Sequence, residues 1–353
     1  MAVQLSLFEA VPMTTKFPST RYQGSKQKYV NWIWECVKDI PFHTVLDAFG
    51  GTGSVAYRMK QEGKEVTYND LLPFNYLIGK ALIENGNVKL EEREIEELLR
   101  CHANISYPDF IESTFKDIYF TDEENHWLDI VLTNIRWMTD PYKQAIAYFA
   151  LFQSCIIKRP YNLFHRRNLY VRLQDVERSF GNKKTWDTPF EVHFRKFVRE
   201  ANNAVFDNGT CCRAMNNDVF NILPHHDLVY IDTPYLNAGV GVDYADFYHF
   251  LNGIVNYDRW DSLIDYNSKH LRLRRQFNEW NDASLIRNAF VRLFTLFQDS
   301  VMVISYRSNG IPAIEELVGI LRELNKEVRI HRGVEMKYAL SKRQSSEVLI
   351  IAR

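Results

Sequence analysis

The sequence predicts an α/β protein with an open, largely parallel sheet, helices on both faces of that sheet, and a mainly helical region inserted into it. Three observations predict this fold. A short apolar run, a glycine turn and a helical pattern follow one another over residues 44–61. A second strand and helix follow over 65–83, and further apolar strands occur at 228–231, 301–305 and 347–352.

The first unit has the order strand, turn, helix, strand, helix. Residues 44–49 form an apolar run that stops at Gly50-Gly51-Thr52-Gly53, and residues 55–61 then have helical periodicity. Residues 65–68 form a second strand, which is followed by a helical stretch from 74 to 83. Such alternation favours parallel pairing, so we expect ligands beyond the carboxyl ends of the strands.

The pattern changes between about residues 91 and 208, where long helical stretches and a basic, aromatic segment replace the rhythm of strands and glycine turns. We therefore predict one domain formed by residues 1–90 and 209–353, which carries the sheet. Residues 91–208 form a second, inserted domain in this prediction.

The bulk composition limits the class of protein. The chain has 353 residues and is 46% apolar, which allows a large core and argues against disorder. Its formal charge of −1 means that a nucleic-acid partner would have to meet a local basic face. Five cysteines without metal-binding spacing indicate a reducing cytoplasm and no metal site. We see no export signal and no membrane-spanning run, so we expect a cytoplasmic protein without a membrane partner.

The glycine turn predicts a cofactor pocket. In Asp47-Ala48-Phe49-Gly50-Gly51-Thr52-Gly53, glycines stand where a strand must turn sharply and let a ligand approach the backbone. A structural turn and a nicotinamide site are the alternatives, although Tyr57 occupies the place where nicotinamide sites have a small residue. The segment resembles the D-x-F-x-G-x-G motif of S-adenosylmethionine-dependent methyltransferases. The resemblance implies that this cofactor is held by Asp47, Phe49, Gly51 and Gly53.

Other segments complete the predicted pocket. Asp70 ends the second strand, where an acidic residue can accept hydrogen bonds from ribose hydroxyls. Arg21-Tyr22-Gln23-Gly24-Ser25-Lys26 resembles the element that begins Dam-type DNA adenine methyltransferases, which implies cofactor contacts for Tyr22 and Lys26. A surface ring and a solvated charge are the alternatives. Asn217-Asp218-Val219-Phe220 resembles an Asp-Phe element of that family near the cofactor adenine, which implies that Asp218 accepts from the adenine amino group; a simple turn residue is its alternative.

Asp232-Thr233-Pro234-Tyr235 follows a buried strand and predicts a catalytic loop at the carboxyl edge of the sheet. An adenine amino group is a poor nucleophile, and accepting hydrogen bonds from both of its N–H groups would localise electron density on the nitrogen. The Asp232 carboxylate and the carbonyl of Thr233 can supply these two acceptors. Tyr235 can stack on a base that has left the duplex, which recovers roughly 1–3 kcal/mol.

This loop resembles the DPPY motif of the Dam-type family, with Thr233 in place of the first proline. If that position contributes mainly its carbonyl, threonine keeps the function and loses some rigidity. An impaired or inactive enzyme is the alternative. Related enzymes that methylate the cytosine amino group usually carry serine in place of the aspartate, so Asp232 favours adenine.

Two basic segments predict the DNA contacts. Residues 156–184 hold eight Lys or Arg against two acidic residues, a local balance of +6. A second cluster of Lys269, Arg272, Arg274 and Arg275 follows the catalytic loop. Packing between domains and a solvated helix face are the respective alternatives. We also expect the loops at 305–310 and 341–346 to face the same side of the sheet. The predicted DNA-binding residues are Arg159, Asn162, His165, Arg166, Arg167, Arg172, Lys269 and Arg272.

The order of the motifs resembles Dam-type DNA adenine-N6 methyltransferases of restriction-modification systems. This resemblance implies a Rossmann-like S-adenosylmethionine-dependent methyltransferase sheet with an inserted helical DNA-recognition domain. It also implies methyl transfer to a flipped adenine in double-stranded DNA without a metal, and a cognate restriction endonuclease as a partner. A catalytically impaired DNA-binding subunit and an RNA amine methyltransferase are the alternatives. The oligomeric state and the recognition sequence are left open.

Overall fold

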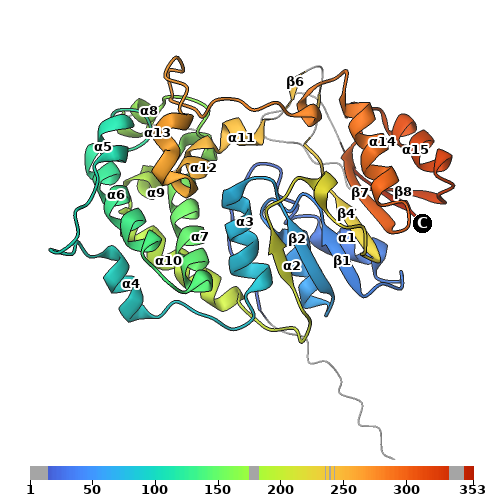
Figure 1. Cartoon of the computed structure of the whole chain (residues 1–353), viewed down its shortest axis with the longest axis horizontal. Helices are drawn as coiled ribbons and strands as arrows, with labels where there is room; N and C mark the ends of the chain where they lie inside the picture. The colour runs from blue at the N-terminus through green and yellow to red at the C-terminus, as the bar shows by residue number, and fades with distance from the viewer. Residues whose placement is uncertain (1–14, 175–182, 235, 238–239, 242, 334–345) are drawn as a thin grey trace, which may run out of the picture.

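The structure is a computed structural model that describes residues 15–174, 183–234, 236–237, 240–241, 243–333 and 346–353. A twisted sheet with its flanking helices forms one half of the molecule, and a bundle of helices forms the other (Figure 1). Among the helices so described, none is long and apolar enough to cross a membrane.

The sheet has seven strands in the order β3-β2-β1-β4-β7-β9-β8. Neighbours from β3 to β7 pair in parallel, whereas β9 runs antiparallel to both β7 and β8. The predicted largely parallel sheet is confirmed, and its five predicted strands lie within two residues of the observed bounds; β3 and β8 were not predicted. The strands are β1 (Thr44–Asp47), β2 (Glu65–Asn69), β3 (Arg213–Met215), β4 (Leu228–Ile231), β7 (Val301–Arg307), β8 (Val328–Arg332) and β9 (Glu347–Ala352), and a separate ribbon pairs β5 (Leu236–Asn237) with β6 (Val240–Gly241).

Helices cover both faces of the sheet, because successive residues of a strand point to opposite sides. On β1, Val45 belongs to the apolar cluster that also contains α1, α2 and α3 residues, whereas Leu46 belongs to the cluster with α14 and α15. The helices predicted at 55–61 and 74–83 correspond to α2 and to α3 with the π-helical turn η1 that follows it. These helices are α1 (Val30–Val37), α2 (Ser54–Gln61), α3 (Pro73–Gly79), η1 (Lys80–Glu84), α14 (Ile286–Leu296) and α15 (Ile314–Glu323).

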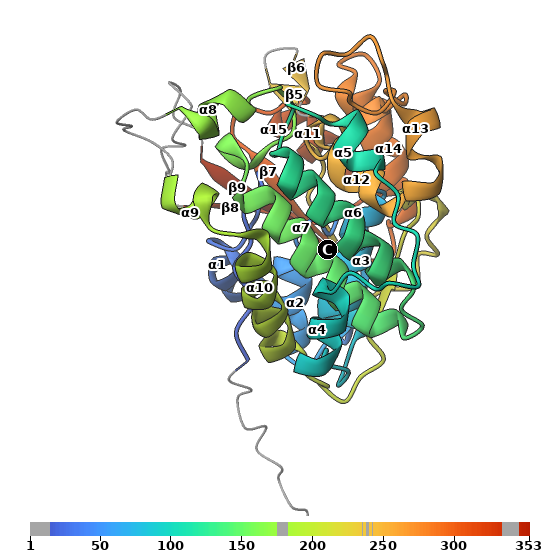
Figure 2. The ribbon, with the colours of Figure 1, turned by 90° about the vertical axis from the view of Figure 1, so that its left-hand side faces the viewer.

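The other half of the molecule is helical, as the sequence predicts, and the described part of 91–208 contains no strand. Its long helix α7 packs against α10 and α3, and Figure 2 shows the bundle face on. Thr121 and Asp140 accept hydrogen bonds from backbone N–H groups of the first turns of α6 and α7, which fixes where these helices begin. The helices are α4 (Glu92–Leu99), α5 (Phe110–Thr114), α6 (Asp122–Arg136), α7 (Pro141–Ile157), α8 (Leu169–Leu173), α9 (Lys183–Asp187) and α10 (Phe190–Ala204).

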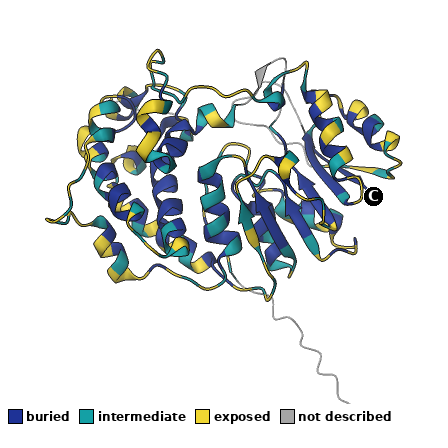
Figure 3. Cartoon of the chain, in the orientation of Figure 1, coloured by how far each residue is buried: buried dark blue, intermediate teal, exposed yellow. Residues whose placement is uncertain are grey.

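Three short helices from the later part of the chain join this bundle: α11 (Tyr244–Phe247), α12 (His249–Val255) and α13 (Trp260–Leu263). Phe250 of α12 lies in the same apolar cluster as Phe152 of α7 and Val45 of β1. Buried residues therefore continue from one half of the molecule into the other (Figure 3). The domain bounds 1–90, 91–208 and 209–353 remain a prediction.

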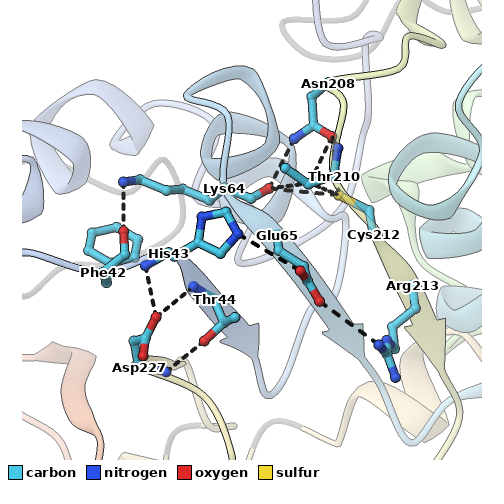
Figure 4. Close-up of polar contacts among 10 residues, drawn as sticks. All are labelled: Phe42, His43, Thr44, Lys64, Glu65, Asn208, Thr210, Cys212, Arg213 and Asp227. Atoms are coloured by element: carbon cyan, nitrogen blue, oxygen red, sulfur yellow. Dashed lines mark hydrogen bonds and ion pairs between the residues drawn. The ribbon is translucent and has the colours of Figure 1, made fainter.

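The amino ends of the central strands are tied together by polar side chains (Figure 4). One carboxylate oxygen of Asp227, just before β4, accepts hydrogen bonds from the backbone N–H groups of His43 and Thr44, both at 2.8 Å. The Thr44 hydroxyl in turn accepts from the Asp227 N–H at 2.9 Å. These bonds fix the register of β1 against β4, whose carboxyl ends carry the site described next.

Candidate active site

One cavity of about 550 Å³ lies at the carboxyl edge of the parallel strands, within the size range of small-molecule sites. The turn after β1, the end of β2 and the loop after β4 all contribute to its wall. Gly53 caps α2 and does not line the cavity, and Tyr235 lies outside the described residues. The predicted site residues that line the cavity are Tyr22, Lys26, Asp47, Phe49, Gly51, Asp70, Asp218, Asp232, Thr233 and Pro234.

The glycine turn after β1 needs its glycines. Gly51 and Gly53 have φ values of +52° and +75°, in the left-handed region that favours glycine. A Cβ at Gly50 would stand 2.0 Å from the ring of Tyr68, so any side chain there would displace that ring. The Tyr68 hydroxyl donates to the Gly51 carbonyl at 2.8 Å. The turn is therefore held tightly against β2 and offers its backbone to the cavity.

Asp70 lies at the end of β2 and organises the same turn. One of its oxygens, Oδ2, accepts hydrogen bonds from the Gly51 N–H at 2.8 Å and from the Asn75 side chain at 3.1 Å. Its other oxygen, Oδ1, accepts from the Leu72 N–H at 2.8 Å. Burial raises the pKa of Asp70 to about 6, against the opposing effect of these three donors.

Asp47 is a buried carboxylate, 2% exposed, at the end of β1. Its Oδ2 accepts from the Ala56 N–H at 3.2 Å, while Oδ1 is buried and has no hydrogen-bond partner among the described residues. Burial, and then the negative charges of Asp232 and Asp70, raise the pKa of Asp47 to about 8. A cationic ligand group in the cavity would favour its ionised form.

Tyr22 stands in a stack of three tyrosine rings on the cavity wall. Its ring lies parallel to that of Tyr248 at 4.4 Å and to that of Tyr244 at 5.6 Å. The Tyr22 hydroxyl accepts from the side chain of Asn75, which also donates to Asp70. The predicted upstream element is thereby connected to the end of β2.

Lys26 lies between two carboxylates. Its Nζ atom is 3.2 Å from Oδ1 of Asp232 and 2.9 Å from Oε1 of Glu347, and its side chain is 6% exposed. Burial would lower the pKa of Lys26, but the charges of Asp232 and Glu347 more than offset this and hold that pKa above its ordinary value. Glu347 was not predicted as a site residue, because it is a single acidic residue at the start of a strand and belongs to no motif.

The rest of the predicted loop and the Asp-Phe element also line the cavity. Thr233 is 2% exposed, and its hydroxyl has no hydrogen-bond partner among the described residues. Asp218 is exposed, and it accepts from the Phe220 N–H at 3.0 Å as the cap of a short 3₁₀ turn. That contact uses one oxygen of Asp218 and leaves the carboxylate at the cavity wall.

Two further lining residues were not predicted. Trp280 packs edge-on against Phe49 at 5.3 Å and stacks on Phe220 at 6.1 Å. Asn69, at the end of β2, donates to the carbonyls of Ala48 and Asn217 and so connects the turn with the Asp218 loop. An isolated tryptophan and a strand asparagine carry no motif. Within the described part of the chain, no group of three or more His, Cys, Asp or Glu is placed to hold a metal ion.

The cavity thus combines a glycine turn with an Asp-x-Pro loop at neighbouring strand ends. Residues 22–308 match the family model described as D12 class N6 adenine-specific DNA methyltransferase. The chain belongs to this family. Its members are enzymes that methylate adenine in DNA, so the predicted recognition and the predicted class of enzyme are confirmed.

Curated relatives agree with this assignment. The chain is 30% identical to the type II methyltransferase M2.HphI of Haemophilus parahaemolyticus over 89% of the chain and 90% of that protein. It is 24% identical to the type II methyltransferase M.NlaIII of Neisseria lactamica over 92% and 93%. The match to M.FokI of Planomicrobium okeanokoites, at 26% identity, spans 93% of the chain but 51% of that longer protein.

Two arginines predicted to touch DNA are structural in this methyltransferase. Arg159 is 1% exposed, lies 4.4 Å from the centre of the Tyr119 ring, and donates to the carbonyls of Tyr119, Leu163 and Arg166. Arg172 is 5% exposed, and both of its terminal nitrogens donate to the carboxylate of Glu124, at 2.8 and 2.6 Å. The structure contradicts the predicted DNA contact of both, because each guanidinium group is buried and its terminal nitrogens are held by carbonyl or carboxylate oxygens within the helical half.

The remaining predicted DNA contacts fall into two groups. Arg166, Arg167 and Lys269 are exposed, whereas Asn162 and His165 are half-buried. The segment that carries Arg166 abuts the cavity wall, because the Phe164 N–H donates to the carbonyl of Phe247, the last residue of α11.

Arg272 is also half-buried and pairs with Asp265 at 3.3 Å. Its neighbours Arg274 and Arg275 are exposed and line the cavity itself. The two loops expected to share one side of the sheet meet where they are described: the Ser308 N–H donates to the Ser346 carbonyl at 3.1 Å. Residues 341–345 lie outside the described residues.

Proposed function

We propose that this enzyme transfers a methyl group from S-adenosylmethionine to N6 of an adenine flipped out of duplex DNA. One observation carries the proposal: the glycine turn after β1 and the Asp232 loop after β4 line the same cavity. Because β1 and β4 are hydrogen-bonded neighbours, a cofactor held at the first would stand beside a base held at the second. Proximity and alignment would then account for most of the acceleration.

The residues of the cavity fit this cofactor. Asp47 has a buried oxygen without a partner, which suits a cationic amino group, and Asp218 presents a carboxylate near the cavity mouth. The backbone of Gly51 is open on the cavity side, where an added Cβ would meet nothing nearer than 3.9 Å. Tyr22 and Asp70 complete the wall. When bound, the cofactor supplies an electrophilic methyl group on a sulfonium.

The Asp232 loop would activate the target base. The Asp232 carboxylate accepts one amino N–H of the adenine, and the backbone carbonyl of Thr233 accepts the other, which concentrates electron density on the nitrogen. Tyr235 would stack on the flipped base. The DPPY motif has a proline at the position of Thr233, and proline offers a backbone carbonyl but no hydroxyl. We therefore propose that the backbone of Thr233, and not its side chain, serves the reaction.

We propose that the DNA lies across the cavity mouth, where Arg166, Arg167, Lys269, Arg274 and Arg275 supply exposed positive charge. Asn162, His165 and Arg272 would support this surface from half-buried positions. The relatives named above are type II methyltransferases of bacteria. On that basis we propose that the enzyme modifies DNA in a bacterial cytoplasm for a restriction-modification system with a cognate nuclease.

The proposal is tested by incubating the pure protein with radiolabelled S-adenosylmethionine and, in parallel reactions, with unmethylated duplex DNA of broad sequence content or with RNA. We expect label in N6-methyladenine and none after the substitution Asp232→Asn. Asp299→Asn makes the same change at an exposed residue and serves as the control. DNA binding without label in any nucleoside would indicate an impaired subunit, and transfer to RNA alone would indicate a different substrate; either result would refute the proposal.

A further inference from the structure

Glu347 reaches the active-site edge from the last strand of the sheet. Strand β9 runs antiparallel to β7, so its first residue lies at the edge where the parallel strands end. Glu347 lies opposite Arg307 in the register of β9 against β7, and it is 2% exposed. It also lies outside residues 22–308, which the family model matches. A carboxylate buried at this edge requires charged or hydrogen-bonding partners.

Those partners lead directly to the catalytic loop. Oε1 of Glu347 accepts a hydrogen bond from the Ser305 hydroxyl on β7 at 2.5 Å and pairs with Nζ of Lys26 at 2.9 Å. The same Nζ is 3.2 Å from Oδ1 of Asp232, which follows β4. The chain of contacts therefore crosses three adjacent strands and ends on the carboxylate that would accept the adenine amino group.

Lys26 and Glu347 have opposite electrostatic effects on the Asp232 carboxylate. An ammonium group paired with Asp232 alone would draw electron density from that carboxylate and make it a weaker hydrogen-bond acceptor. Glu347 shares the same ammonium, so its negative charge offsets part of this effect. It also fixes the position of Nζ, because Ser305 holds the Glu347 carboxylate from the neighbouring strand.

We propose that Glu347, held by Ser305, is a positioning residue. It keeps the Lys26 ammonium beside Asp232 and offsets part of the effect of that ammonium on the Asp232 carboxylate, so that Asp232 remains an effective acceptor for the target amino group. This inference rests on the proposed function of Asp232. It assigns the last strand a part in the chemistry that its apolar sequence does not indicate.

The test is the substitution Glu347→Gln, with Glu327→Gln as a matched control at an exposed glutamate directly before β8. Without the negative charge of Glu347, Asp232 would face the Lys26 ammonium alone, which favours the ionised form of Asp232. We expect kcat for methyl transfer to fall roughly 10- to 100-fold. We also expect the acid limb of the kcat profile to move to lower pH.

A second readout uses the protein without cofactor. Carbon-13 NMR of aspartate-labelled protein follows the Asp232 carboxyl, which is identified by its loss in Asp232→Asn, and its titration should also move to lower pH in Glu347→Gln. A purely structural role would lower the active fraction and leave both titrations unchanged, which would overturn the inference. If Glu347→Gln does not fold, Ser305→Ala removes only the donor and should still lower kcat; an unchanged kcat would refute the proposal. The wild-type protein is assayed for adenine methylation in the same experiment. If the wild type does not methylate adenine, the proposed function fails; if it does and the variants behave like the wild type, only this inference fails.

Discussion

Because of the buried carboxyl group of Asp47, the free energy of unfolding of the cofactor-free protein should fall as the pH rises. In the unfolded chain its carboxyl loses its proton near 3.8, whereas in the folded protein burial and then Asp232 and Asp70 raise its pKa to about 8. Between these values the folded state holds a proton that the unfolded state has lost. The free energy of unfolding therefore contains a contribution that is fully present below pH 3.8 and is lost as the pH rises to about 8.

The substitution Asp47→Asn removes this proton exchange and keeps the shape of the side chain. A shift of about four units corresponds to about 5 kcal/mol, and because Asp232 and Asp70 share the effect we expect roughly 2–5 kcal/mol. Measured by urea unfolding between pH 5 and 8.5, the variant should gain stability over the wild type as the pH rises. It should also lose cofactor binding. A stability difference that is the same at every pH would refute this reasoning.

Three further predictions concern the strand ends, the buried arginine and the exposed basic residues. Asp227→Ala removes the acceptor of two backbone N–H groups and should lower the free energy of unfolding by about 1–3 kcal/mol in urea titrations. Adenine methylation should be retained in the folded protein. No loss of stability would contradict the structural role of the Asp227 contacts drawn in Figure 4. Arg159→Met leaves the buried carbonyls of Tyr119 and Leu163 without this donor and should destabilise the protein by about 1–3 kcal/mol. A fully stable variant with weaker DNA binding would restore the DNA-contact interpretation. The double variant Arg166→Glu, Arg167→Glu should reduce the slope of log affinity against log salt by about 2; an unchanged slope would exclude phosphate contacts there.

The predictable part of the fold is the part whose sequence pattern is local. The strand, glycine turn and helix around Gly51 follow from an apolar run and from backbone conformations that only glycine adopts easily. Strand β3 was missed because it is short and half-exposed, with Arg213 at its start. Strand β8 was missed because it lies at the edge of the sheet, where exposed charged residues such as Arg329 interrupt the apolar pattern.

The errors at Arg159 and Arg172 have a different cause. A run of basic residues reports charge, but it does not report which of those charges the fold buries. Glu124, 48 residues before Arg172, supplies the carboxylate that pairs with it, and Tyr119 supplies the ring beneath Arg159. Burial and the two cationic partners have opposing effects on Glu124, and Arg172 and Lys158 prevail and hold its pKa below the ordinary value. Long-range partners of this kind are set by tertiary packing, and no local spacing encodes them.

The topology explains why the active site collects residues from both ends of the chain. Parallel strands deliver Asp47, Asp70 and Asp232 to one edge, because each of these residues follows or ends its strand. Several carboxyl groups would then lie close together at that edge, and each would disfavour the ionisation of the others. The antiparallel β9 adds a further carboxylate, Glu347, and the segment before α1 brings Lys26 to meet it. The Lys26 ammonium lies beside Asp232 and Glu347 and offsets part of their negative charge, whereas Asp47 has no cationic partner of this kind and burial raises its pKa. The site therefore pairs the carboxylate proposed for the base with a cation of the protein, and leaves Asp47 to be paired by a cationic group of the cofactor.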